Sequence, residues 1–374
     1  MSEWVRSILG DLCKLKAGSA FPQAEQGGAN SDYPFVKVSD LSSNSKYLQQ
    51  SNNWITEEQL ERLRPALAPA GAVLFAKIGE GLRNERFRVA VRPTAFDNNL
   101  MSAMAKPERC TVDFLFYLLA TINVSTYVEG SALPYLKQSV LQQVEVHVPC
   151  LREQQAIAEV LGALDDKIAA NTKLSRSASD LAELEFRRLM LRSHESVTMA
   201  QVLTLEYGKS LPAVKRTNGP VKVYGSGGIV GRHTEALCDG PGVVVGRKGT
   251  AGAVHWASGP FFPIDTTFWA KPSTEWISPI FSYFLLKSLR LDEMNSDSAV
   301  PGLNRNEAHA IAVRRPESDQ LRDFTTSAME LFDVVSQMDR ENELLAMTRD
   351  TLLPQLMSGK LRAKEAQALV EELV

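Results

Sequence analysis

Cysteine is scarce in this chain, and no apolar segment is long enough to cross a membrane. The four cysteines among 374 residues form no CxxC pair, which excludes a disulfide framework and a cysteine-rich metal site. Apolar runs such as FLFYLLA at 114–120 fall short of the roughly 18 residues that a membrane span requires. The N-terminal MSEWVRSILG also lacks the apolar core of a signal peptide. We therefore expect a soluble cytoplasmic protein that has no contact with a membrane.

Motifs that would indicate catalysis are also missing. The GKS at 208–210 fails as a phosphate-binding loop because Leu203 stands where that motif needs glycine. The glycines of YGSGGIVG (224–231) are followed by no apolar helix, so they predict a tight loop rather than a dinucleotide site. The five histidines have no metal-ligand spacing, and no metal site is expected. Asp165-Asp166-Lys167 resembles a nuclease fragment, but it lies within a predicted helix, and a solvated charged turn is favoured there. These absences favour a binding protein without catalytic activity.

The net charge of the chain is −3, but its charged residues are unevenly distributed along the sequence. Residues 77–92 hold five basic and two acidic side chains, and residues 205–250 hold seven basic and three acidic ones. Residues 317–374 carry twelve acidic against six basic side chains. An acidic C-terminal segment thus masks two basic regions, and a solvated charged surface is the alternative to a binding surface for each of them.

The chain repeats itself at offsets of 166 to 171 residues, which indicates a duplicated unit. The copies occur in the same order, and each closes on a proline that is followed by a long helical stretch. The matching segments are PAGAVLFAKIG (69–79) with GPGVVVGRKGT (240–250), FLFYLLAT (114–121) with IFSYFLLK (280–287), SALPYL (131–136) with SAVPGL (298–303), and VEVHVP (144–149) with IAVRRP (311–316).

Each copy is predicted to be a globular part followed by a helix, in an α+β fold. We expect globular domains at 1–150 and 194–316, a central spacer helix at 151–193, and a C-terminal spacer helix at 317–374. Apolar residues recur in the helices at steps of three and four, the spacing of a coiled-coil seam. Asn171 and Asn342 fall on the two seams, where a polar side chain fixes register. A position at the wet edge of each stripe remains an alternative for either asparagine. Pro354 should end or kink the second helix, and Gly359 should end any helical turn beyond it.

Six segments, in order, resemble the DNA-specificity (S) subunit of type I restriction–modification enzymes. They are YPFVKVSDLS (33–42), LREQQAIAEVLGALDDKIAANTKL (151–174), VKVYGSGGIVGRH (221–233), VVVGRKGTAGAV (243–254), SAVPGLNR (298–305) and RDTLLPQLMSGKLR (349–362). The second helix departs from the pattern, because it begins PESDQLRDF where the family form resembles the REQQAIA of the first.

The resemblance implies two target-recognition domains in tandem, joined by two long antiparallel coiled-coil helices, that read a bipartite sequence in double-stranded DNA. It also implies two methyltransferase subunits as partners, which would supply S-adenosylmethionine and methylate adenine, and motor-nuclease subunits that would cleave unmodified DNA. The chain itself would be non-catalytic and would carry no cofactor or metal. A two-headed coiled-coil scaffold that binds proteins is the alternative, and a nuclease or methyltransferase that acts alone ranks third.

Polar residues near the Gly-containing loops and after each Ser-Ala-aliphatic-Pro segment are the candidates for DNA contact. Arg and Lys neutralise phosphates or read guanine, whereas Asn and Gln read adenine. The candidates in the first domain are Lys77, Arg83, Arg86, Arg88, Lys137 and Gln138. Those in the second domain are Lys222, Tyr224, Ser226, Arg232, Arg247, Lys248, Asn304 and Arg305.

Overall fold

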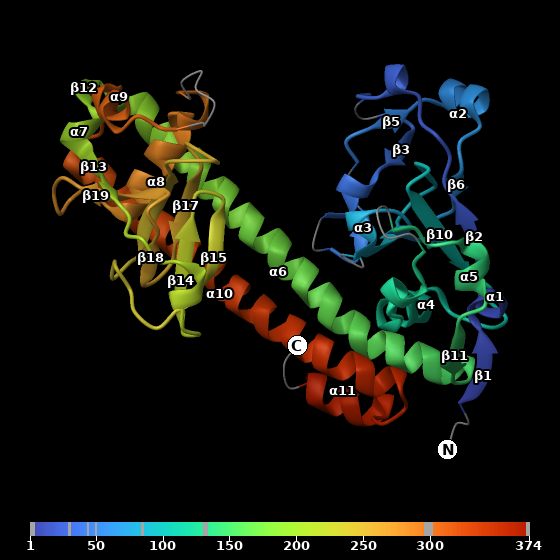
Figure 1. Ribbon diagram of the computed structural model, residues 1–374. Helices are drawn as coiled ribbons and strands as arrows, with labels where there is room; N and C mark the ends of the chain where they lie inside the picture. Colours follow the sequence, from blue (N-terminus) through green and yellow to red (C-terminus); the bar gives the residue numbers. More distant parts are fainter. Residues whose placement is uncertain are drawn as a thin grey trace. The chain divides into compact units, whose positions relative to one another are not determined.

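The computed structural model describes residues 4–28, 31–42, 45–48, 51–83, 86–129, 134–294 and 302–371. These residues form two compact units, each with its own core. Unit 1 comprises residues 1–171 and 341–374, and unit 2 comprises residues 172–340. Each unit mixes sheets with helices, so the predicted α+β class is confirmed (Figure 1).

Unit 1 contains a five-stranded sheet, a four-stranded sheet and a two-stranded ladder. The five-stranded sheet has the order β2 (Cys13–Ala17), β10 (Leu100–Ala105), β7 (Val73–Ala76), β8 (Phe87–Ala90), β4 (Tyr47–Leu48). The four-stranded sheet has the order β5 (Trp54–Ile55), β3 (Tyr33–Val36), β9 (Thr94–Phe96), β6 (Leu67–Ala68), and β1 (Val5–Ile8) pairs with β11 (Glu145–Val148). The helices of this globular part are α1 (Leu9–Leu12), α2 (Glu57–Leu63), α3 (Glu80–Arg83), α4 (Val112–Thr121) and α5 (Gln138–Gln142).

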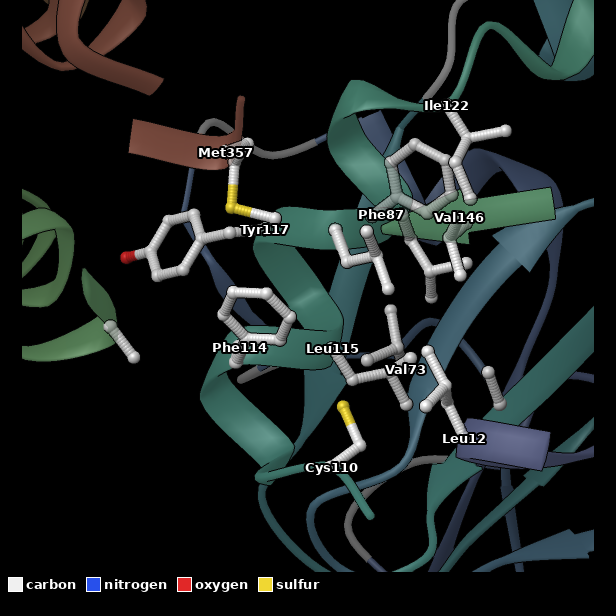
Figure 2. Packing of buried hydrophobic residues seen from close by; sticks show 14 of the residues in the cluster. Leu12, Val73, Phe87, Cys110, Phe114, Leu115, Tyr117, Ile122, Val146 and Met357 are labelled. Carbon is white, nitrogen blue, oxygen red and sulfur yellow. The ribbon is translucent and has the colours of Figure 1, made fainter. Parts of the chain in front are cut away.

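Helix α4 packs on the five-stranded sheet and forms the centre of the unit 1 core. Thr111 caps the helix by accepting a hydrogen bond from the Phe114 N–H at 3.4 Å. The side chains of Phe114 and Leu115 are fully buried in the same cluster as Val73 of β7, as Figure 2 shows. All four residues of β7 are buried, which explains why its sequence VLFA is continuously apolar rather than alternating.

Unit 2 repeats this arrangement with fewer strands. Its main sheet has the order β13 (Leu203–Tyr207), β19 (Thr267–Pro272), β16 (Gly242–Gly246), β17 (Val254–Ala257). The second sheet has the order β15 (Gly228–His233), β14 (Val221–Gly225), β18 (Phe261–Pro263), and β12 (Glu195–Thr198) pairs with β20 (Ala312–Arg315). The short helices are α7 (Met199–Val202), α8 (Pro279–Ser288) and α9 (Arg305–Ala310).

The sequence repeat corresponds to a structural repeat. The matched segments fall on β7 and β16, on α4 and α8, and on β11 and β20, which occupy equivalent places in their units. The parallel pairing of β3 with β9 recurs as the parallel pairing of β14 with β18. The predicted tandem duplication is thus confirmed, although residues 131–133 and 298–301 of the Ser-Ala-aliphatic-Pro segments lie outside the described residues.

Two long helices contribute to both cores. Helix α6 spans Leu151–Arg192 and α10 spans Ser318–Met357. In unit 1 they run antiparallel, since Asp165 pairs with Arg349 while Lys167 pairs with Glu341. In unit 2 Glu185 of α6 accepts a hydrogen bond from Ser327 of α10 at 2.7 Å. The predicted pair of long antiparallel helices is confirmed.

The seam residues that the periodicity selected are largely buried. Ile157, Leu161 and Leu164 of α6 lie in the unit 1 core with Leu345, Leu352 and Leu356 of α10. Leu321, Phe324 and Ala328 lie in the unit 2 core. Of the two outcomes expected at Pro354, the helix does not end there, because α10 continues to Met357; Gly359, with φ of 70°, follows its end as predicted. The final helix α11 spans Ala363–Glu371.

The prediction of a solvated turn at Asp165-Asp166-Lys167 is wrong for Asp165. This carboxylate is 8% exposed, accepts a hydrogen bond from the Tyr117 hydroxyl at 2.6 Å and pairs with Arg349 at 2.7 Å. Burial, followed by the neighbouring Asp165 carboxylate, raises the pKa of Tyr117 well above its usual value, so the phenol keeps its proton. One charged residue thus joins α4, α6 and α10 within unit 1.

Among the described helices, none combines the length and apolar character that a membrane span needs. The same residues contain no group of three His, Cys, Asp or Glu side chains arranged to hold a metal ion.

Candidate nucleic-acid interface

In unit 2, the loop after β16 lies against the segment that leads into α9. The Arg247 N–H donates to the Thr266 carbonyl at 2.9 Å, and the Leu303 N–H donates to the Arg247 carbonyl at 2.9 Å. Lys248 forms an isolated β-bridge with Gly302. These bonds use backbone atoms only, so they fix the positions of both loops while the side chains remain available for another purpose.

Glycine makes the tight turn of the loop after β16 possible. A Cβ atom built at Gly246 would lie 2.1 Å from the Thr250 carbonyl oxygen, well inside van der Waals contact. Gly252 has φ of 82°, and a Cβ atom there would lie 2.2 Å from the backbone nitrogen of Asp292. Glycine at these two positions is therefore required for the turn itself.

A basic and aromatic cluster lies where these loops meet the end of β13. The guanidinium carbon of Arg247 is 5.2 Å from the centre of the Tyr207 ring, and that of Arg305 is 5.4 Å from the same ring. Arg247 also lies 6.0 Å from the ring of Phe268. Two cations share one ring that is 52% exposed, so the cluster presents positive charge at the surface. We call Tyr207, Arg247 and Arg305 the guanidinium cluster.

Asn304 and Lys248 lie beside the guanidinium cluster, and both are exposed. The Asn304 side chain caps α9 by accepting a hydrogen bond from the Asn306 N–H at 3.0 Å, and its amide donates to Glu307 at 2.7 Å. A structural role at the helix start therefore explains this asparagine in part. His309, one turn further along α9, accepts a hydrogen bond through Nε2 from the Leu205 N–H at 2.9 Å and anchors the helix to β13.

The hairpin of β14 and β15 carries two more candidate cations and two residues that are buried. Lys222 and Arg232 stand opposite each other in the ladder. Tyr224, by contrast, is 4% exposed and packs on Phe261, while the Ser226 hydroxyl donates to the Thr266 carbonyl at 2.5 Å inside the unit. Burial of Tyr224 and Ser226 argues against direct contact with DNA, because neither polar group reaches the surface.

Unit 1 repeats the loop frame of unit 2 with different side chains. The Lys77 N–H donates to the Asn99 carbonyl at 2.8 Å, and the Leu136 N–H donates to the Lys77 carbonyl at 2.8 Å. Ile78 and Tyr135 form the β-bridge that corresponds to the bridge of Lys248 with Gly302. Lys77 thus occupies the place of Arg247, and the two residues after Leu136 occupy the places of Asn304 and Arg305.

The side chains around this frame in unit 1 line a pocket of about 440 Å³. Lys137 is exposed and pairs with Glu129 at 2.5 Å, and this hydrogen bond lowers the pKa of Glu129 and raises that of Lys137. Gln138 donates through Nε2 to the Leu15 carbonyl at 3.1 Å, which leaves its carbonyl oxygen as an acceptor. Lys77 lines the same pocket.

The remaining candidates of unit 1 do not converge on this pocket. Arg86 is exposed. Arg88 is half-buried, donates to the Phe87 carbonyl at 2.5 Å and lines a different pocket together with Arg349. Burial, and then the charge of Arg86, lowers the pKa of Arg88 to about 10. The Arg83 side chain lies outside the described residues.

Sequence reasoning missed Tyr207, although it lies at the centre of the guanidinium cluster. No local motif marks it, because its position depends on the β13–β19 register, in which Tyr207 stands opposite Phe268. The local signal for Tyr207 is that an aromatic residue ends a strand in which buried and more exposed positions alternate.

The two seam asparagines belong to unit 1 and lie close in sequence to its boundaries at residues 171 and 341. Asn171 is 5% exposed, and its Nδ2 is buried without a hydrogen-bond partner among the described residues. Asn342 is partly buried. The antiparallel register set by Asp165 with Arg349 and by Lys167 with Glu341 brings Asn171 and Asn342 to about the same level of the helix pair.

Comparison with known proteins points to one family. Residues 1–178 match the family model described as type I restriction modification DNA specificity domain. The type I restriction enzyme MjaIX specificity subunit of Methanocaldococcus jannaschii is 25% identical over 232 residues, which cover 59% of this chain and 52% of that protein. The MjaVIII specificity subunit of the same organism is 22% identical over 179 residues, 46% of this chain and 41% of that one.

A likeness to a solved structure covers more of the chain. The crystal structure of the type I restriction-modification system S subunit from M. genitalium superimposes with a TM-score of 0.63 at 18% identity, over 95% of this chain and 96% of that chain. At this identity the likeness concerns the fold. The chain spans about half the length of the curated relatives that it matches.

Proposed function

Since residues 1–178 match the family model of the type I restriction modification DNA specificity domain, we propose that this chain is the sequence-specific DNA-binding subunit of a type I restriction–modification enzyme. The observation that carries the proposal is the loop frame that occurs twice. Each unit holds a basic loop against the entry of a short helix by the same backbone bonds, at Lys77 with Leu136 and at Arg247 with Leu303. A duplicated basic frame suits a bipartite target on double-stranded DNA.

We further propose a separate role for each part of the chain. Residues 1–150 and 194–316 each recognise one half of the target, and the helices at 151–193 and 317–374 act as spacers. An α-helix rises 1.5 Å per residue, so a helix of about 40 residues spans roughly 60 Å. Asn171 and Asn342 fix the register of the helix pair, because a buried polar layer disfavours slipped pairings.

The proposed DNA-contacting residues are polar residues of the two loop frames, of the segment that holds Arg83 and Arg86, and of the β14–β15 hairpin. Phosphate contacts supply most of the affinity and base contacts supply the specificity. In unit 1 they are Lys77, Arg83, Arg86, Lys137 and Gln138. In unit 2 they are Lys222, Arg232, Arg247, Lys248, Asn304 and Arg305. Tyr224, Ser226 and Arg88 are left out, the first two because they are buried and Arg88 because it lines another pocket.

Catalysis belongs to partner subunits in this proposal. Two methyltransferase subunits bind the chain and supply S-adenosylmethionine, and motor-nuclease subunits join them to cleave unmodified DNA in the cytoplasm. Methylation of adenine requires the base to leave the stack, so the specificity subunit must hold the duplex in register while its partner extrudes the base. The acidic side chains of residues 317–374 would repel DNA and suit contacts with protein.

Mapping of methylated adenine by single-molecule sequencing tests the proposal. Cells would express a methyltransferase subunit from the same genome alone, with the wild-type chain, or with a chain carrying Lys77→Ala and Arg247→Ala. Arg322→Ala is the matched control, because Arg322 is a 78% exposed cation on α10 and belongs to neither loop. We expect a split motif only with the wild-type and control chains. No new methylated motif, with the methyltransferase subunit active and bound to the chain, would refute the proposal and favour a protein-binding scaffold.

A further inference from the structure

We propose that Arg247 and Arg305, braced by the ring of Tyr207, read guanine in the half-site that unit 2 recognises. The inference rests on the proposed DNA-binding function and adds which residues read bases and which base they select. It also predicts that the two half-sites differ, since unit 1 carries other side chains at the equivalent places.

The first support is the geometry of the guanidinium cluster. Both guanidinium groups lie within 5.4 Å of the centre of one ring. Contact with an aromatic face removes part of the rotational freedom of a long arginine side chain before any ligand arrives. A guanidinium group held in this way still presents its Nη atoms in its own plane, as a fork of parallel N–H donors.

The second support is the charge of the cluster. Two like charges near one ring repel each other, and no described carboxylate forms an ion pair with either arginine. The Arg247 Nε is buried and has no hydrogen-bond partner among the described residues. Glu206, next to Tyr207 in sequence, instead accepts a hydrogen bond from the Thr204 hydroxyl at 3.3 Å. A ligand rich in acceptors would offset the repulsion between the two guanidinium groups.

Guanine is the base that fits a guanidinium fork. Its major-groove edge presents two acceptors, N7 and O6, at the spacing of two parallel N–H donors. A phosphate would also accept such a fork, but a phosphate contact strengthens binding to every sequence alike. The rigid loop frame favours base reading, because the Arg247 carbonyl is bonded to the Leu303 N–H and the two loops therefore hold both arginines on one short stretch of surface.

Unit 1 offers a different chemistry at the same places. Lys77 replaces Arg247 and Gln138 replaces Arg305, by the equivalence of the loop bonds in the two units. Lysine is a point charge without a planar fork, and glutamine pairs best with adenine. Gln138 already donates one N–H to the Leu15 carbonyl, so its carbonyl oxygen and second N–H remain for a base. The half-site of unit 1 should therefore show a weaker preference for guanine than that of unit 2, because Lys77 has no planar fork of donors.

Selection from a library of random duplexes tests this inference. The full chain, in complex with a methyltransferase subunit from the same genome, would be incubated with the library at one fixed salt concentration, and the enriched duplexes would be sequenced. Wild type would be compared with Arg247→Lys, Arg305→Lys and Tyr207→Leu, and with Arg322→Lys as a control that makes the same exchange at a 78% exposed arginine of unit 2 outside the proposed DNA-contacting residues. The lysine variants keep the charge and remove only the fork.

We expect the wild-type complex to select a split motif with guanine in one half. Each lysine variant of the cluster should lose about tenfold or more of the preference for guanine at a single position, with the other half and the salt dependence unchanged. Tyr207→Leu should weaken the same preference. Equal loss of affinity for all sequences, or no change, would overturn the inference and leave the DNA-binding function standing. A wild-type complex that enriches no motif at all would instead overturn the proposed function itself.

Discussion

Removal of the Arg349 side chain should destabilise unit 1 strongly, because it would leave Asp165 charged and buried. The Asp165 side chain is 7% exposed and accepts hydrogen bonds from Arg349 at 2.7 Å and from Tyr117 at 2.6 Å. Breaking a buried ion pair by deleting one partner typically costs about 3–5 kcal/mol. Arg349 is 28% exposed and the Tyr117 bond survives, so we expect Arg349→Leu to lower the free energy of unfolding by about 3 kcal/mol.

The measurement should follow unit 1 alone, since two units need not unfold together. Hydrogen exchange of peptides from α4 and α6, followed by mass spectrometry at increasing urea, gives the free energy of unfolding of that region. Arg6→Ala is the matched control, because the Arg6–Glu145 pair is 68% and 58% exposed and should contribute at most about 1 kcal/mol.

A second substitution separates the buried charge from simple loss of packing. Asp165→Asn keeps an acceptor for Tyr117 and removes the charge, so the double variant with Arg349→Leu should recover about 2 kcal/mol relative to Arg349→Leu alone. If Arg349→Leu costs no more than Arg6→Ala, or if Asp165→Asn deepens the loss, the assignment of Asp165 as a buried charge that depends on Arg349 is wrong.

Three further predictions concern other parts of the chain. Burial, and then the charge of Arg305, lowers the pKa of His309, so the folded protein binds fewer protons there than the unfolded chain. The resulting stabilisation is complete above pH 6.5 and is lost as the pH falls toward the lower pKa of the folded state. His309→Phe should flatten that part of a plot of unfolding free energy against pH. Replacing both Asn171 and Asn342 by leucine should raise the free energy of unfolding, measured by urea titration, by about 1 kcal/mol, because a buried amide is removed. An unchanged or lower free energy of unfolding would count against the seam assignment. Lys248→Ala should weaken binding to all DNA sequences alike and reduce the slope of log affinity against log salt by about 1; a change at one base position would assign it to reading instead.

The duplicated α+β units and the long antiparallel helices were predictable from the sequence, because the repeat and the steps of three and four residues are periodic signals. The burial of Asp165 was not, because its neighbours come from three helices, and a charged triplet reads as exposed in any local window. Tyr224 and Ser226 were misjudged as surface residues for a similar reason. The glycines around them indicate a loop, but the pairing of β14 with both β15 and β18 turns these two side chains inward.

The candidate site was predictable in part. Basic side chains near glycines were visible as local composition, and Arg247 and Arg305 were both selected, yet nothing in the sequence showed that they share a ring. That contact forms because backbone hydrogen bonds bring three segments together. They are the strand that ends at Tyr207, the loop that begins at Gly246 and the segment that begins at Leu303. Long-range backbone pairing of this kind leaves no periodic trace in the chain.

The backbone bonds that hold the paired loops have an evolutionary consequence. Because the frame at Lys77 with Leu136, and at Arg247 with Leu303, is built from amide and carbonyl groups, the side chains at those places can be exchanged with little effect on folding. One copy can then drift to a new preference while the other keeps its own. Under the proposed function, a lineage that carries this architecture would acquire new DNA targets by changing a few codons in one half of the gene.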